Sequence, residues 1–97
     1  MIRHMVMFRW TPEATPEQKQ RVVTELNRLP ALLPALRAYH VGADLGLVEG
    51  NFEFAAVADF DDLEGYQTYR VNPEHRAIIA EFIQPIAAQR AAVQYEF

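Results

Sequence analysis

The sequence predicts an α+β fold of the ferredoxin-like type, a four-stranded antiparallel sheet with its helices on one face. Four segments have the apolar pattern of strands, and helical segments follow the first and the third of them. Right-handed crossovers with room for one intervening strand give the strand order 4-1-3-2. The length of 97 residues fits one domain, residues 1–97.

The first ten residues are expected to form the first, central strand. Alternation places His4, Val6 and Phe8 on one face of this strand, and Met5 and Met7 on the other. Both faces are therefore apolar, although a monomeric sheet of this type should expose one polar face to water. This predicts a homodimer in which a second copy stacks its sheet on the face that carries Met5 and Met7.

Capping residues define the start of the first helix. Thr15 and Gln18 have capping-box spacing, and Pro16 suits the first helical position. The apolar stripe that follows predicts an amphipathic helix that stops near Pro30. The next two strands are expected in LRAYHVGADL and FEFAAVADF.

The segment YRVNPEH is expected to join the last two helices. Asp61 and Glu64 have capping spacing for a short helix that cannot continue through Pro73. Pro73 suits the first position of a final helix, which would be capped by Asn72 and run to about Gln84. The fourth strand is expected in AAVQYEF.

The composition excludes several classes of protein. The nine basic residues are scattered and the net charge is -4, so we expect no nucleic-acid partner. Without cysteine there is no disulfide or thiolate site, and no motif predicts a metal site. No signal peptide and no apolar run of membrane-spanning length is recognised, so we expect a cytoplasmic protein without a membrane partner.

His75 is the first candidate catalytic residue. Ile79 and Phe82 follow it by four and seven residues, so all three share the helix face that turns toward the sheet. On the shorter helix, Tyr66 and Tyr69 can lean toward the same interior. An imidazole can act as a general acid or base near neutral pH, and a tyrosine hydroxyl can donate to a developing oxyanion.

His4 completes the candidate group because it shares the inward face of the first strand. The group also fits a structural role, since an inward histidine is more often a hydrogen-bonded core residue than a catalyst. His40, alone in the second strand, is interpreted as a structural or surface residue.

Three motifs together resemble the stress-responsive A/B barrel (Dabb) family. They are RHMVMFRW at the start, G-N-F after the second strand and Y-x-x-N-P-E-H before the last helix. The resemblance covers almost the whole chain. It implies a dimeric α/β barrel, in which two four-stranded sheets face each other and the helices lie outside.

The resemblance also implies roles for particular residues. A plant cyclase of this family closes a linear polyketide by aldol condensation without a cofactor. Its essential histidine corresponds to His75, its tyrosine to Tyr69 and its first-strand histidine to His4. The resemblance therefore favours Tyr69 over Tyr66 as the hydroxyl donor.

This chain departs from the plant cyclase at several positions, which changes the expected substrate. Asn72 stands where that enzyme has a histidine, and Val22 and Val23 stand where it has aromatic residues. We expect the pocket to be lined by Val6, Phe8, Val22, Val23, Leu26, Tyr66, Asn72, Ile79 and Phe82.

Two functions remain open from the sequence. As an enzyme without cofactors, the protein would catalyse a cyclase, lyase or isomerase step on a small apolar carbonyl or polyketide-like compound, with His75 as base and Tyr69 as oxyanion donor. As a non-enzymatic, stress-related dimer, it would bind a small apolar ligand or none. The enzyme interpretation requires His4, Tyr69 and His75 to converge on a cavity.

Overall fold

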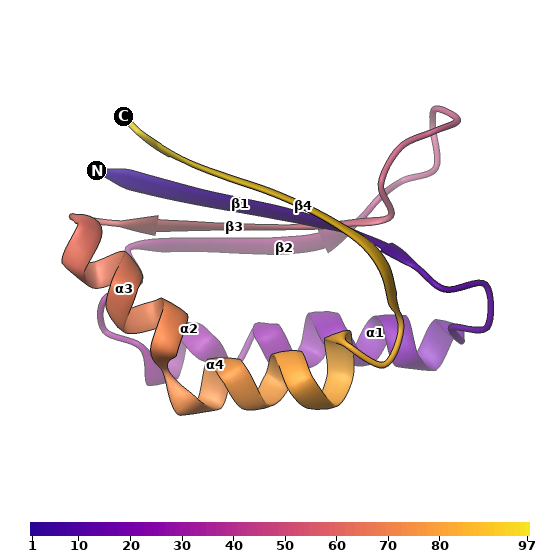
Figure 1. Cartoon of the computed structure of the whole chain (residues 1–97), viewed down its shortest axis with the longest axis horizontal. Helices are drawn as coiled ribbons and strands as arrows, with labels where there is room; N and C mark the ends of the chain where they lie inside the picture. The colour runs from indigo at the N-terminus through magenta and orange to yellow at the C-terminus, as the bar shows by residue number, and fades with distance from the viewer.

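A computed structural model describes residues 1–97 as one sheet covered by helices on one side (Figure 1). The elements are β1 (Ile2–Trp10), α1 (Pro16–Leu26), α2 (Leu29–Leu32), β2 (Ala38–Ala43), β3 (Phe54–Phe60), α3 (Leu63–Val71), α4 (Pro73–Ile78), the π turn η1 (Ile79–Ile83) and β4 (Ala87–Glu96). All neighbouring strands are antiparallel, in the order β2-β3-β1-β4. The predicted fold class and strand order are confirmed, and within one chain the sheet remains open.

Strand β1 lies between β3 and β4 and contributes alternate residues to the core. His4, Val6, Phe8 and Trp10 are all buried on the face beneath the helices. The Phe8 and Trp10 rings stack with centroids 5.6 Å apart, and Phe54 of β3 packs 5.7 Å from Trp10. The aromatic end of the core therefore lies around the second half of β1.

Helix α1 begins as predicted and ends earlier than predicted. Thr15 and Gln18 form the reciprocal capping box, and Pro16 occupies the first turn. The helix ends at Leu26, and Pro30 lies in the first turn of the short helix α2. Pro30 therefore starts a new helix, because its missing N–H has no consequence at that position.

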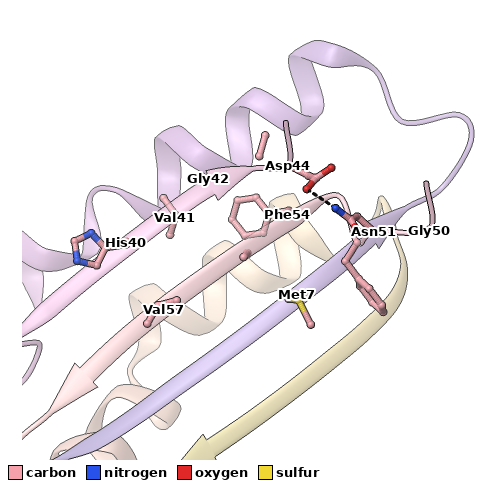
Figure 2. A pocket seen from close by; sticks show the side chains of 12 residues that line it. Met7, His40, Val41, Gly42, Asp44, Gly50, Asn51, Phe54 and Val57 are labelled. Carbon is pink, nitrogen blue, oxygen red and sulfur yellow. Dashed lines mark hydrogen bonds between the residues drawn. The ribbon is translucent and has the colours of Figure 1, made fainter. Parts of the chain in front are cut away.

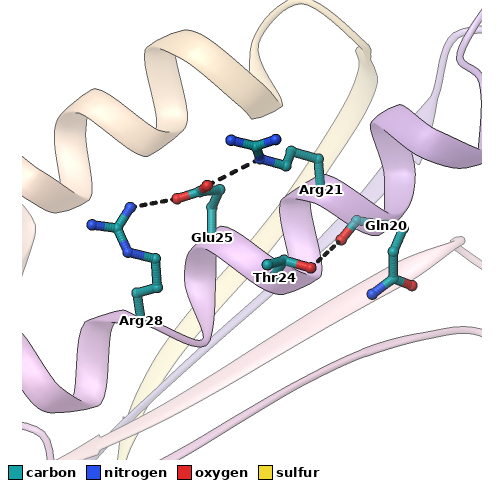
Figure 3. Close-up of polar contacts among 5 residues, drawn as sticks. All are labelled: Gln20, Arg21, Thr24, Glu25 and Arg28. Carbon is teal, nitrogen blue, oxygen red and sulfur yellow. Dashed lines mark hydrogen bonds and ion pairs between the residues drawn. The ribbon is translucent and has the colours of Figure 1, made fainter.

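A buried carboxylate is neutralised at the end of α1. Glu25 accepts hydrogen bonds from Arg21 Nε at 3.0 Å and from Arg28 Nη1 at 2.6 Å (Figure 3). The hydrogen bond from Arg28 lowers the pKa of Glu25 despite burial, so this side chain keeps its charge. Arg21 also lies over the Phe82 ring, 5.1 Å from its centroid, and so links α1 to η1.

The corner between β3 and α4 contains two helix caps. Asp62, rather than the expected Asp61, caps α3 by accepting from a backbone N–H at 2.9 Å, while Asp61 binds Arg37. Asn72 caps α4 as predicted, and its side-chain oxygen accepts from the backbone N–H of His75 at 3.0 Å. This hydrogen bond fixes the first turn of α4, which carries His75.

The last helical segment changes from an α-helix to a π turn at Ile79. Gln84 N–H donates to the carbonyl oxygen of Ile79 at 2.8 Å, a bond across five residues. The segment ends near Gln84 as expected, but the wider turn changes which side chains point inward. Ile83 is 3% exposed in the core, and Phe82 is only partly buried.

No helix covers the other face of the sheet (Figure 1), and the centre of this bare face is apolar. Met5 lies opposite Val57 and Val93, and Met7 lies opposite alanines on both neighbouring strands. Met7 is 39% exposed and Val93 is 52% exposed, which is unusual for adjoining apolar side chains. None of the helices is both long and apolar enough to cross a membrane.

The Asn72 cap should contribute measurably to stability. Asn72→Ala should lower the free energy of unfolding by about 1 kcal/mol, because the His75 N–H loses its partner. Urea denaturation measures this change. Asn27→Ala is the matched control, because Asn27 is exposed, caps no helix start and should change stability by less than about 0.5 kcal/mol. Equal effects of the two substitutions would contradict the capping role.

Candidate active site

Three elements bring His4, Tyr69 and His75 together beneath the sheet. The Tyr69 and His75 rings, from α3 and α4, lie with centroids 4.0 Å apart. His4 projects from β1, with its ring centroid 6.0 Å from Tyr69 and 5.4 Å from Tyr66. All three side chains of the predicted catalytic group are buried, at 3% to 8% exposure.

These rings border two adjoining cavities between the sheet and the helices. The inner cavity has a volume of about 60 Å³ and mainly apolar walls. The outer cavity has a volume of about 140 Å³ and is bordered by exposed arginines. The residues common to both cavities are His4, Tyr69, His75, Ile79 and Arg90.

The expected lining residues divide into two groups. Those that border the cavities are Val6, Phe8, Leu26, Tyr66 and Ile79. Val22 lies fully enclosed in the core, and Val23 borders a separate surface cleft. Asn72 uses its side-chain oxygen for the helix cap, and Phe82 is turned away beneath Arg21 by the π turn.

Burial keeps the candidate group uncharged at neutral pH. It lowers the pKa of His75 to about 4, and together with the nearby charge of Arg90 it lowers the pKa of His4. Burial also raises the pKa of Tyr69 to about 12 and that of Tyr39 well above its usual value. The cavities are therefore lined by neutral imidazoles and protonated phenols.

Hydrogen bonding differs between the two histidines. His4 Nδ1 lies 2.9 Å from the amide nitrogen of Gln94, and because an amide nitrogen only donates, the neutral ring carries its proton on Nε2. His75 Nδ1 and the Tyr39 hydroxyl are buried without a hydrogen-bond partner in the chain. Such atoms lower stability, and in a cavity they are available to a ligand.

Sequence analysis does not single out Tyr39, Arg90 or Gln94. Arg90 and Gln94 lie opposite Phe8 and His4 in the sheet, and therefore face the helices. The fourth strand was expected to start at residue 91, whereas β4 begins at residue 87 and includes Arg90. Arg90 and Gln94 are four positions apart, so on a strand their side chains lie on the same face. This even spacing is the sequence signal that could have identified both residues.

A wider hollow lies on the bare face of the sheet. It has a volume of about 590 Å³ and extends from Met7 and Val57 to the β2–β3 loop, where Asn51 donates to Asp44 at 3.3 Å (Figure 2). His40 borders this hollow, on the face opposite the other two histidines. Asp44 also borders this hollow, just beyond the end of β2, but its carboxylate accepts hydrogen bonds from the Gly46 N–H and from Asn51. We therefore place the candidate chemistry in the cavities beneath the sheet, where the other two histidines and Tyr69 lie together. No group of three or more histidine, aspartate or glutamate side chains is arranged to hold a metal ion.

The antiparallel sheet order and the single layer of helices on one face define a ferredoxin-like α+β domain. The sequence model of the Stress responsive A/B Barrel Domain matches residues 2–97. The chain belongs to this family, which confirms the resemblance found in its motifs. No curated protein sequence matches the chain.

Several solved structures share this fold. A dimeric ferredoxin-like protein of unknown function from Thermobifida fusca YX is 48% identical, with a TM-score of 0.92 over 99% of this chain and 90% of that chain. A dimeric protein of unknown function from Bacteroides fragilis NCTC 9343 is 27% identical, with a TM-score of 0.83 over 99% and 95% of the two chains. Hydroxynitrile lyase from Passiflora edulis is 19% identical, with a TM-score of 0.83 over 97% and 90%, a likeness that shows the fold alone.

The low pKa of His75 predicts how stability changes with pH. Between pH 6.5 and about 4, the unfolded chain binds a proton at His75 and the folded chain does not. Stability should therefore fall as the pH is lowered through this range, with a contribution from His75 of at most about 1.4 kcal/mol per pH unit. Urea denaturation of the wild type and His75→Gln measures the effect: the variant should show a shallower dependence on pH. Identical slopes would contradict the low pKa.

Proposed function

We propose that the protein catalyses a cofactor-free proton transfer on a small apolar carbonyl or polyketide-like compound, as part of a cyclase, lyase or isomerase reaction. The observation that supports this proposal is the convergence of His4, Tyr69 and His75 on one pair of cavities. These side chains supply a base and hydroxyl or N–H donors without a covalent nucleophile.

His75 is the proposed base. Its ring removes a proton from the carbon next to the substrate carbonyl, and the electrons of that C–H bond form an enolate. Tyr69, still protonated because its pKa is about 12, donates a hydrogen bond to the enolate oxygen. A pKa of about 4 makes His75 a weak base in the empty protein, but the negative charge of the enolate stabilises the imidazolium as it forms.

His4 is the proposed second donor to the same oxygen. The hydrogen bond from Gln94 to Nδ1 leaves the His4 proton on Nε2, the other side of the ring. A donor held in this way needs little reorganisation when the oxyanion forms, which is the condition for electrostatic stabilisation. Gln94 is therefore a positioning residue rather than a catalytic one.

The alternative is a non-enzymatic, stress-related dimer that binds a small apolar ligand or none. The contact of Tyr69 with His75 at 4.0 Å and the small volume of the inner cavity, about 60 Å³, favour this alternative. Rings packed in this way also serve as core residues. The two hypotheses, enzyme and ligand binder, are distinguished by whether the protein transfers a proton to or from a substrate.

We also propose that two copies associate through the sheet face that carries Met5 and Met7. The bare apolar face supports this proposal, as do the related dimeric proteins from Thermobifida fusca YX and Bacteroides fragilis. Stacking two sheets would remove both apolar faces from water at about 25 cal/mol per Å². The two open sheets would then form one α/β barrel with the helices outside.

Met5→Glu tests the association. A pairing of this kind should bury on the order of 1,200 Å² or more, and two buried like charges would oppose it. Light scattering at micromolar concentration should give a dimer for the wild type and for the volume-matched Met5→Leu. Met5→Glu should give a monomer or an aggregate, and a monomeric wild type would refute the proposal.

Exchange of carbon-bound protons for deuterium tests the proposed reaction. Small ketones and 1,3-diketones incubated with the protein in D₂O should exchange their acidic protons, as followed by NMR. His75→Gln should lower the enzyme-dependent rate by about 10² to 10⁴-fold, and Tyr69→Phe by about 10²-fold. His40→Gln, on the opposite face of the sheet, should leave the rate unchanged.

Melting temperatures distinguish catalysis from packing. His75→Gln should keep most of the fold, since the amide retains much of the size and hydrogen-bonding capacity of the imidazole. Full exchange activity together with a severe loss of melting temperature would make His75 a core residue. The binder alternative then remains.

A further inference from the structure

The nine Lys and Arg side chains differ in how they are neutralised. Five form ion pairs with carboxylates, namely Arg3, Lys19, Arg21, Arg28 and Arg37. Arg9 donates to the Gly50 carbonyl oxygen at 2.7 Å and lies over the Phe52 ring. The remaining three are Arg70, Arg76 and Arg90, whose side chains make neither an ion pair nor a hydrogen bond within the chain.

These three unpaired arginines border the same cavity. Arg70 comes from α3, Arg76 from α4 and Arg90 from β4, and all three line the outer cavity beside the His–Tyr group. No aspartate or glutamate lines either the outer or the inner cavity. A protein of net charge -4 therefore has an uncompensated positive rim at its candidate active site.

We infer that this rim binds the carboxylate of an anionic substrate, whose apolar part enters the outer cavity beside Tyr69 and His75. This inference rests on the proposed function and specifies its substrate class as a small oxo acid. Guanidinium groups match the planar carboxylate with paired hydrogen bonds, and three of them surround the opening. The outer cavity, at about 140 Å³, is close to the size of an engineered cavity that holds benzene, so one small ring or short chain fits.

Binding of an anion would also change the neighbouring imidazoles. The charge of Arg90 contributes to the lowered pKa of His4, and that of Arg76 to the lowered pKa of His75. A bound carboxylate offsets these charges and so makes protonation of both rings easier. The substrate would therefore strengthen the base that acts on it.

Matched ligands of equal size and different charge test the inference. Benzoate and the neutral benzamide are titrated into the intact protein at neutral pH and followed by amide NMR shifts. Benzoate should bind at least about tenfold more tightly than benzamide, as expected for a hydrogen-bonded charge pair. The preference should weaken when salt is raised from about 50 to about 500 mM, because the arginines are exposed.

Single charge removals locate the site. Arg70→Gln, Arg76→Gln and Arg90→Gln should each weaken benzoate binding several-fold without changing benzamide binding. Arg37→Gln is the control, because Arg37 pairs with Asp61 and borders neither cavity. Equal affinities for the two ligands, or benzoate binding insensitive to all three rim substitutions, would overturn the inference.

Phenyl phosphate separates a carboxylate site from a phosphate site. A phenyl phosphate affinity at least about tenfold above that of benzoate would overturn the carboxylate assignment in favour of a phosphate ester. Because these titrations measure binding alone, they are independent of the deuterium exchange. If the protein prefers benzoate to benzamide but exchanges no carbon-bound protons for deuterium, the proposed reaction is overturned. If it exchanges these protons but shows no preference for benzoate, the anion site is overturned.

Discussion

The constraint on which the rest of this structure depends is the register of β1 between β3 and β4. Because successive side chains of β1 point to opposite faces, His4 and Val6 face the helices, and Met5 and Met7 lie on the bare face. A slip of one residue would exchange these sets and remove both the candidate site and the apolar outer face. Small residues next to β1 leave space for the cavities beneath the sheet. His4 lies opposite an alanine on β3, and Val6 lies between alanines on both neighbouring strands.

Local signals explain what the sequence predicts well, and tertiary contacts explain what it misses. The capping residues Thr15 and Asn72 act within a few positions, so they mark the starts of α1 and α4 correctly. The start of β4 depends on pairing with β1, where Ala87 lies opposite Trp10 and Arg90 opposite Phe8, so no local signal marks the early residues of β4 as a strand. The π turn likewise has no local signature, and its effect on Phe82 follows only from packing.

Two groups of polar side chains, one around Glu25 and one at the outer cavity, differ in whether the buried or the exposed side chains carry the charge. Glu25 is a buried carboxylate held between Arg21 and Arg28, so its charge is fully compensated (Figure 3). At the cavity the arrangement is reversed, because the cations at the rim have no partner and the buried groups beneath them are neutral. The first arrangement supports a helix contact, whereas the second is suited to a partner from outside the chain.

The π turn gives this fold a way to vary its interior by changing chain length. A π turn corresponds to an α-helix that has gained one residue, so a single deletion between Ile79 and Ile83 would restore the regular helical repeat. Side chains beyond the deletion would rotate by about 100° around the axis, while the Asn72 cap and His75 before it would keep their places. Such a deletion would thus change the wall of the inner cavity at Ile83 without altering the residues proposed to carry the proton.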